Sequence, residues 1–283
     1  MRTAAHWRSR RFPLAVGLAV ALLLTPLAVL AQDAPSSSVF EPGVVSLPGI
    51  DETSPSVSQD GQTLLFARTD GWEDKVPFLA VREAHGWRVE RATFADTVYN
   101  AALSPDGQTA FFQVRQPAGD STVDRVYRSD RTGDGWTEPV ELPTLAGRGA
   151  GYISVVPDGT LYLFASRPRP GIYRAEPAGD GRYGNPVWLG DAVSPEGATS
   201  FDALVHPDED RLIISRYVDD SEREDLGESG FYLYRRAGDG WTEVRRLDLP
   251  YGWGATVLPD GRFLFVADGD LQTVPLAEIG VDW

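Results

Sequence analysis

Carboxylate side chains that could carry out acid–base chemistry stand at two places in the chain, at Asp51 and Glu52 and at Asp202. Most glycosidases use two carboxyl groups that flank the bond they break, one as a general acid and one as a base or nucleophile. The distance between the two groups decides the mechanism, and the sequence does not give this distance. If the chain is an enzyme, we expect Asp51, Glu52 and Asp202 to carry the reaction, and the sequence identifies no other catalytic residue.

A second group of polar and aromatic side chains precedes a set of short apolar runs. These residues differ from one run to the next, whereas the turns that follow the runs stay nearly the same. Loops that vary on a constant scaffold are where binding residues concentrate. The candidate ligand-binding residues of this group are Tyr99, Asn100, Arg148, Tyr152, Phe201, Asp202, Tyr251 and Trp253.

Four arginines follow recurring turn aspartates by eight or nine residues, and they are Arg68, Arg115, Arg167 and Arg216. Several guanidinium groups around one opening could clamp a carboxylate or an acidic sugar through paired hydrogen bonds. A structural role fits the same spacing, because an arginine that ties each repeat unit to a neighbouring carboxylate or carbonyl also recurs once per unit. The repetition favours the structural interpretation, and the four arginines are kept as candidate ligand-binding residues.

The sequence gives little support to a metal site or to catalysis by histidine. Beyond residue 31 the only histidines are His85 and His206, and we expect both to lie on the face opposite the candidate residues. A histidine-based triad or a zinc site is therefore not predicted. The acidic stretch at 219–228 lacks the ordered ligand spacing of a calcium loop. The sequence predicts no metal site and no cofactor.

The structural elements that position these candidate residues are expected to follow a repeat in the sequence. A short apolar run, a turn related to Pro-Asp-Gly and a second apolar run occur five times, with turn aspartates Asp60, Asp106, Asp158, Asp208 and Asp260. Successive turn aspartates are 46, 52, 50 and 52 residues apart. A period of about 40 to 50 residues is typical of the blades of a β-propeller. We predict an all-β fold, a five-bladed β-propeller with four antiparallel strands in each blade.

The fifth unit lacks a fourth strand after its third, which is expected near residues 271–275. Residues 40–48 resemble the fourth strand that is expected at 136–143. An N-terminal strand that completes the last blade would close the ring and remove two exposed sheet edges. In propellers the first strand of each blade runs along the central channel. The segment before the first strand and the segment after the second therefore open on one face, which we call the funnel face.

The N-terminus has the pattern of an export signal. Four arginines, an apolar stretch at 14–24 and Val-Leu-Ala before Gln32 predict a signal peptide over residues 1–31, with an uncleaved anchor as the alternative. We expect a flexible segment at 32–38 and a single propeller domain at 39–283. The signal contains four of the 26 basic residues and no acidic ones, so the mature chain has 22 basic and 41 acidic residues.

Such an acidic surface repels nucleic acid and anionic membrane. The chain has no cysteine, so no disulfide stabilises it. We expect a monomer without a membrane span after signal cleavage, located in the periplasm or secreted.

The strings SPDGQTAFF, GWTEPVELP and GFYLYRR resemble the blades of the TolB-like family of bacterial propellers, a WD-like group with a Pro-Asp-Gly hairpin in each repeat. The resemblance covers residues 40–278. It implies an exported protein that binds or organises components of the cell envelope. Peptidase relatives carry a Gly-x-Ser-x-Gly motif, which is absent here.

The sequence thus favours a non-catalytic module whose funnel face binds a protein, peptide or glycan of the cell envelope. The first alternative is a glycoside hydrolase or lyase with acidic residues around the channel. A second alternative is a structural module that docks a partner through the sides of its blades.

Overall fold

The computed structural model describes residues 35–71, 75–119, 121–133, 135–219 and 223–283. Residues 34–283 form one compact unit. The predicted signal peptide at 1–31 and its predicted cleavage site lie outside the described residues. Within the described part of the chain, no helix is long and apolar enough to cross a membrane.

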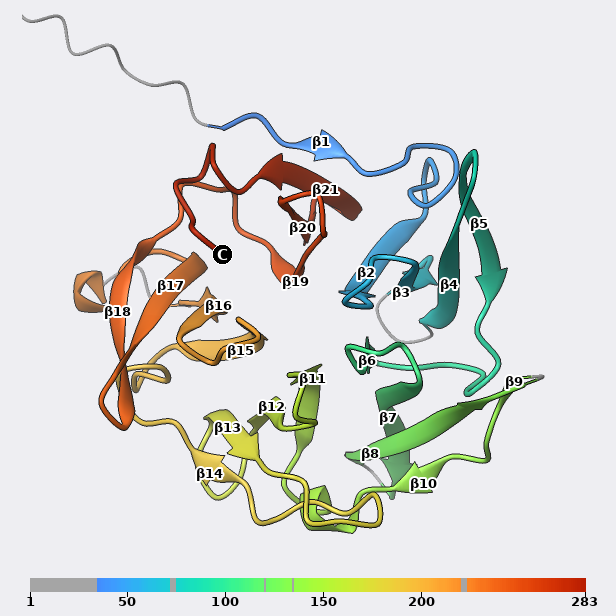
Figure 1. Ribbon diagram of the computed structural model, residues 1–283. Helices are drawn as coiled ribbons and strands as arrows, with labels where there is room; N and C mark the ends of the chain where they lie inside the picture. The colour runs from blue at the N-terminus through green and yellow to red at the C-terminus, as the bar shows by residue number, and fades with distance from the viewer. Residues whose placement is uncertain (1–34, 72–74, 120, 134, 220–222) are drawn as a thin grey trace, which may run out of the picture. The chain divides into compact units, whose positions relative to one another are not determined.

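Five antiparallel sheets are arranged around a central channel, which confirms the predicted five-bladed propeller (Figure 1). Blade 1 consists of β2 (Asp51–Val57), β3 (Thr63–Thr69), β4 (Val76–Glu83) and β5 (Gly86–Arg91). Blade 2 consists of β6 (Asn100–Leu103), β7 (Thr109–Ala118), β8 (Ser121–Thr132) and a fourth strand that is split into β9 (Gly135–Trp136) and β10 (Val140–Glu141).

Blade 3 consists of β11 (Ala150–Val155), β12 (Leu161–Ala165), β13 (Gly171–Ala175) and β14 (Val187–Trp188). Blade 4 consists of β15 (Thr199–Val205), β16 (Arg211–Tyr217), β17 (Gly230–Ala237) and β18 (Gly240–Arg246). Blade 5 consists of β19 (Trp253–Val257), β20 (Arg262–Ala267), β21 (Asp270–Pro275) and the N-terminal strand β1 (Ser38–Val39). In the described part of the chain, two short 3₁₀ helices occur in connecting segments, at Pro143–Leu145 and Glu224–Leu226.

The ring closes through the N-terminal strand, as predicted, but the pairing lies slightly earlier in the chain. Ser38 pairs with Thr273 and Val39 with Gln272, and the amide of Phe40 donates to the carbonyl of Leu271. The sequence placed this strand at 40–48. Residues 41–46 instead form a turn, in which Glu41 has a positive φ of 44° and the amides of Val44 and Val45 bond its carbonyl.

The hydrophobic core is divided among the five contacts between neighbouring blades. Each of the five clusters of buried side chains draws on two successive blades. The cluster between blades 5 and 1 contains Leu264 and Leu271 from one side and Leu64 and Phe66 from the other, with Phe40 beside Trp87. Because both faces of every sheet are buried against neighbours, no blade has a core of its own.

The Pro-Asp-Gly hairpins share one hydrogen-bond pattern. The side chains of Asp60, Asp106, Asp158 and Asp260 each accept a hydrogen bond from the amide two residues later, at 2.8 to 3.2 Å. The next residue has a positive φ in all five turns, and this position is glycine except in blade 4, where Glu209 adopts a φ of 52°. The hairpins therefore serve the scaffold.

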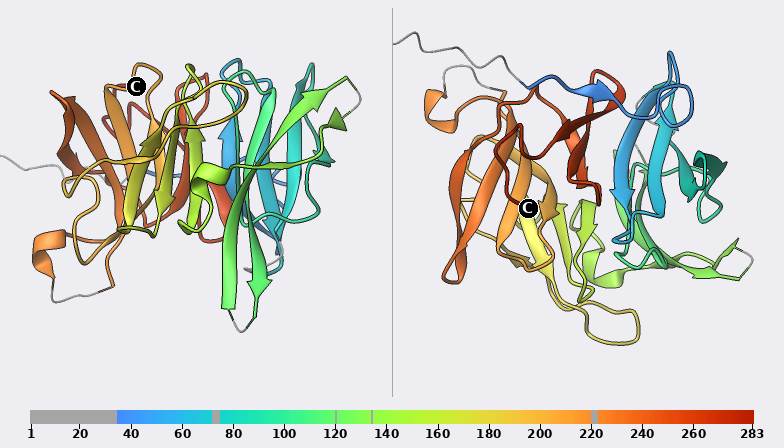
Figure 2. Two further views of the ribbon diagram at one scale, coloured as in Figure 1. Left: turned by 90° about the horizontal axis from the view of Figure 1, so that it is seen from below. Right: turned by 45° about the horizontal axis from the view of Figure 1, so that its top comes forward.

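The hairpin of β7 and β8 is the longest in the molecule's described part and extends beyond the other blades on the funnel face (Figure 2). This extension carries Arg115 and Asp124. It gives one side of the funnel a wall that the other blades lack.

Replacement of Phe40 by Ala tests the closure. Phe40 is 1% exposed and packs in the cluster that joins the first and last blades. Its truncation should lower the free energy of unfolding by about 3 kcal/mol or more, because a buried aromatic ring leaves a cavity. Chemical denaturation measures this loss, and Val44→Ala, at a residue 42% exposed, is the control. Equal stability of the two variants would contradict a role of this segment in closure.

Candidate functional site

The inner strands carry a recurring irregularity that directs side chains toward the channel. In blades 1, 3, 4 and 5 the pairing of the first two strands shifts by a residue, as in a β-bulge. The residue six positions before the turn aspartate then has a positive φ between 48° and 55°: Ser54, Tyr152, Asp202 and Gly254. Asn100 holds this position in blade 2, whose first strand has no shift. Non-glycine residues in this conformation are strained and cluster at functional sites.

These five residues form a ring at which two cavities adjoin. The channel cavity, of about 410 Å³, extends from the ring to the hairpin face, where prolines of the turns line it. The floor cavity, of about 190 Å³, lies on the funnel face of the ring. Ser54, Asn100 and Tyr152 line both cavities, so the ring separates them. A third space, the funnel cavity, has about 440 Å³ and shares Tyr152, Phe201 and Tyr251 with the floor cavity.

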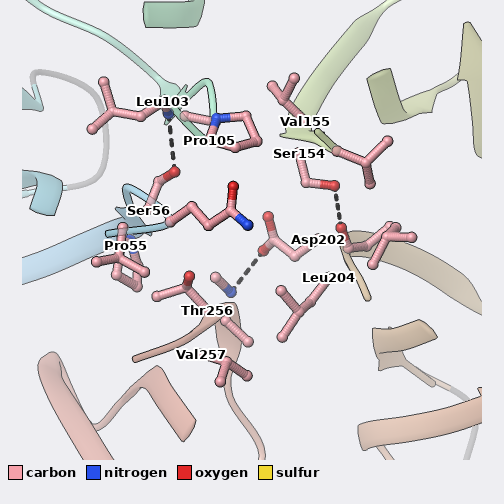
Figure 3. A pocket seen from close by; sticks show the side chains of 18 of the residues that line it. Pro55, Ser56, Leu103, Pro105, Ser154, Val155, Asp202, Leu204, Thr256 and Val257 are labelled. Carbon is pink, nitrogen blue, oxygen red and sulfur yellow. Dashed lines mark hydrogen bonds between the residues drawn. The ribbon is translucent and has the colours of Figure 1, made fainter. Parts of the chain in front are cut away.

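Asp202 is the carboxylate of the ring and points into the channel cavity (Figure 3). One of its oxygens, Oδ2, accepts a hydrogen bond of 2.9 Å from the amide of Gly254 in the next blade. Burial raises the pKa of Asp202 to about 6, although the Gly254 amide and the positive charge of Lys75 act in the opposite direction. A carboxyl group with a pKa near 6 can exchange a proton close to neutral pH.

Lys75 supplies a buried positive charge near the ring. It is 5% exposed and lines the floor cavity, and its Nζ donates to the carbonyl of Tyr99 at 3.0 Å. Burial lowers the pKa of Lys75 to about 8, the charge of Asp202 opposes this shift, and the charge of Arg115 adds to it. The two cavities are therefore electrostatically coupled through Lys75 and Asp202.

Aromatic rings form the walls of the funnel and floor cavities. Tyr152 packs against Tyr99 and Phe201 with ring centroids 6.1 and 5.4 Å apart, and Tyr251 lies 6.0 Å from Trp253. Burial raises the pKa of Tyr251 to about 12, and the neighbouring Tyr217 and the charge of Asp202 add to this effect. All five predicted aromatic residues thus line the floor cavity on the funnel face. Asn100 lines the same cavity, and its side-chain amide donates a hydrogen bond of 3.2 Å to the hydroxyl of Ser54.

The three carboxylates predicted from the sequence do not come together. Asp51 lines a separate cavity of about 250 Å³ between blades 1 and 5. Glu52 is 0% exposed, lies 3.3 Å from Arg68 and accepts a hydrogen bond from the Leu47 amide. Of these three carboxylates only Asp202 faces the central channel, so it alone remains a candidate catalytic residue.

The predicted clamp of four arginines does not form, because the one-residue difference in their spacing reverses their direction. Neighbouring residues of a strand point to opposite faces. Arg68 and Arg216, eight residues after the turn aspartate, turn into the blades, where Arg68 donates to two backbone carbonyls and Arg216 contacts Glu243 at 2.7 Å. Arg115, nine residues after, lines the funnel cavity. Arg167 also follows by nine residues but lies beyond the end of β12, exposed to solvent.

Two further predicted residues occupy other places. Arg148 donates to the carbonyl of Thr144 at 2.9 Å within the segment before β11. His206 lies by the hairpin of blade 4, as expected, where it lines the channel cavity and contacts Trp283. Among the described residues, no group of three or more His, Cys, Asp or Glu side chains could hold a metal ion.

Among the residues that line the funnel-face cavities and that sequence reasoning missed are Lys75, Gln113 and Asp124. Lys75 belongs to no repeated position. Gln113 could have been found, because the residue seven positions after the turn aspartate is small in the other blades, namely Ala67, Ala165, Ser215 and Ala267.

Comparison with known proteins shows the fold. No family model and no curated protein matches the chain. A mannose phosphorylase from Leishmania mexicana, solved in complex with phosphate ion, is 13% identical with a TM-score of 0.52, over 86% of this chain and 91% of that one. A gluconolactonase from Xanthomonas campestris is 13% identical with a TM-score of 0.51, over 82% and 86% of the two chains.

TolB from Acinetobacter baumannii, also a propeller, is 15% identical with a TM-score of 0.47 over 80% of this chain. The alignment covers 54% of TolB, so the chain spans about half of that protein's length. Because no family model matches, membership of the TolB-like family stays a prediction.

These comparisons correct the main functional prediction. The sequence favoured a module without catalysis, but similar structures with TM-scores above 0.5 include a mannosyltransferase, a mannose phosphorylase and a gluconolactonase, all of them enzymes. The interpretation as a non-catalytic binding module is therefore wrong, and the alternative of an enzyme is the better one. At this level of identity the likeness itself extends to the fold alone, so the reaction must be argued from the site.

The buried Glu52 predicts a pH dependence of stability. Its pKa is raised from 4.5 to about 7, mainly by burial, so the folded chain keeps this proton at pH values where the unfolded chain has lost it. The resulting stabilisation is present below pH 4.5 and is lost as the pH rises to 7, by up to about 3 kcal/mol. Glu52→Gln should remove this part of the pH dependence, measured as the difference from wild type in unfolding free energy between pH 5 and pH 8. The exposed Glu138→Gln is the control, and parallel curves for wild type and Glu52→Gln would refute the prediction.

Proposed function

We propose that the chain is an enzyme that cleaves glycosidic bonds of carbohydrates, with Asp202 as the general acid. The observation that carries this proposal is a carboxyl group with a pKa of about 6 in the ring, where it lines the channel cavity next to the floor cavity. A general acid must be protonated at the working pH and must reach the leaving oxygen, and a raised pKa meets the first need.

The surroundings of Asp202 support this role. Its bond to the Gly254 amide holds one carboxyl oxygen in place, and its backbone has a positive φ of 48°. The aromatic walls provide flat apolar surfaces on which the C–H faces of a sugar ring can pack. Polar groups between them, such as Asn100 and the hydroxyl of Tyr152, can bond sugar hydroxyls.

In the proposed reaction the substrate binds in the floor cavity and extends through the ring, so that its glycosidic oxygen reaches Asp202 in the channel cavity. Asp202 donates its proton to this oxygen as the bond to the anomeric carbon breaks. Water or an acceptor hydroxyl then attacks the anomeric carbon and gives up a proton, and a proton returns to Asp202 from solvent. The proposal keeps the cleavage chemistry inferred from the sequence but assigns it to one carboxylate in place of three.

The proposal includes a place of action. The export pattern at 1–31 and the resemblance to TolB-like propellers support a periplasmic or secreted enzyme, and a glycan of the cell envelope would be its natural substrate. These points rest on the sequence, because the predicted signal lies outside the described residues.

Replacement of Asp202 by Asn tests the proposal directly. Asparagine tolerates a positive φ and can still accept from the Gly254 amide, but it cannot donate an acidic proton. We expect kcat to fall by about 10²- to 10⁴-fold, measured on aryl glycosides and by release of reducing ends from envelope oligosaccharides. Asp239→Asn, in an exposed turn, should keep full activity. Absence of turnover in the wild-type protein, or equal turnover in the Asp202 variant, would overturn the assignment.

The charge of Lys75 should set the pH profile of the same reaction. Because Asp202 acts in its protonated form, kcat/KM should be constant below pH 6 and fall above it. The positive charge of Lys75 lowers the pKa of Asp202, so Lys75→Met should move this fall to higher pH. A profile that stays in place, with only its height reduced, would show that Lys75 acts through packing alone.

A further inference from the structure

Two exceptions to the repeat meet at the wall of the funnel cavity. Gln113 replaces the small residue found at this position in the other blades, and it is 3% exposed. Gly151, seven positions before its turn aspartate, stands where the other blades have Thr53, Tyr99, Phe201 and Trp253. A Cβ atom on Gly151 would overlap the side-chain carboxamide of Gln113. The glycine in blade 3 therefore makes room for the glutamine in blade 2.

The paired exceptions place an unsatisfied polar group at the cavity. Gln113 lines the funnel cavity, and among the described residues its Oε1 atom has no hydrogen-bond partner. A buried polar atom without a partner costs about 1–3 kcal/mol. The scaffold does not require this residue, since alanine or serine fills the position in four blades. The cost is explained if a ligand completes the hydrogen bonds of the carboxamide.

Arg115 stands two residues further along β7 and lines the same cavity. Residues i and i+2 of a strand share a face, so the carboxamide and the guanidinium form one polar strip. The Nε atom of Arg115 bonds Asp124 at 3.1 Å, and the guanidinium lies 3.9 Å from the centroid of the Tyr99 ring. These contacts hold the guanidinium in a fixed plane, which favours paired bonds to a carboxylate.

The charges that face the two funnel-side cavities favour an anion. They come from Arg115 and Lys75, which are positive, and from Asp124, which is acidic. The sum of these three charges is positive, and Asp202 lines the channel cavity on the other side of the ring. The chain as a whole has a formal charge of −15, so this is a local exception to an acidic surface.

We propose that the funnel cavity is the subsite for an acidic sugar unit, a hexuronate, whose carboxylate binds Arg115 and one of whose hydroxyls binds the carboxamide of Gln113. A hydroxyl can donate and accept, so it matches the carboxamide in either orientation. The rings of Tyr152, Phe201 and Tyr251 pack on the apolar faces of the sugar. This inference rests on the proposed function, because it names the substrate class of the same site.

Binding to the Asp202→Asn variant tests the inference without turnover. The probes are glucuronate, galacturonate and mannuronate, each against its neutral hexose, with acetate as the carboxylate without a sugar, at one ionic strength. Calorimetry should show at least tenfold tighter binding of one uronate than of its hexose and of acetate. Arg115→Gln should remove the preference for the uronate over the hexose. Equal affinity of uronate and hexose, a preference that survives Arg115→Gln, or acetate binding as tightly as the uronate would each refute the inference.

Gly151→Ala separates a ligand role of Gln113 from a packing role. The added methyl group meets the flexible end of the Gln113 side chain, so the variant should fold with a displaced carboxamide and bind the uronate at least fivefold more weakly. Adding Gln113→Ala to Gly151→Ala should restore thermal stability but not binding. Full binding in the double variant would overturn the assignment of Gln113.

The outcomes distinguish this inference from the proposed function. Turnover of neutral glycosides that depends on Asp202, without a preference for uronates, would leave the glycosidase proposal intact and reject the acidic subsite. Uronate binding that depends on Arg115, without any turnover in the wild-type protein, would reject the catalytic proposal.

Discussion

The structure depends on the closure of a ring in which no sheet has a core of its own. Each cluster of buried side chains is shared by two blades, so a blade is stable only between two neighbours. The pairing of Ser38 and Val39 with β21, and the burial of Phe40 next to it, join the first and last blades. The positions of the inner strands, and with them every side chain at the channel, follow from this closure.

The fold could be predicted from the sequence because its signals recur. Five turn aspartates at regular spacing gave the number of blades, and the missing fourth strand of the last blade indicated closure from the N-terminus. The pairing of β1 lay earlier than predicted because the resemblance of residues 40–48 to a fourth strand comes from a turn. A resemblance between the side chains of two segments does not show which residues of the segments pair through their backbones.

The site was predictable only in part. The aromatic group and Asp202 come together because all of them precede a turn aspartate by similar distances. Asp51 and Glu52 were placed with them, but alternation along β2 buries Glu52, at a position that Val98, Ala150 and Ser200 occupy in other blades. Alternation also separates Arg115 from Arg68. Lys75 comes from a segment outside the repeat, and only tertiary packing brings it to the ring.

The bulge in the inner strands has a consequence for how such a protein can change. It turns one residue toward the channel in each of blades 1, 3, 4 and 5, and serine, tyrosine, aspartate and glycine occupy this place with nearly the same φ. The backbone of these blades therefore accepts different side chains there while the contacts between blades stay the same. A single substitution at one of these positions would therefore change a side chain at the channel without changing the contacts between blades.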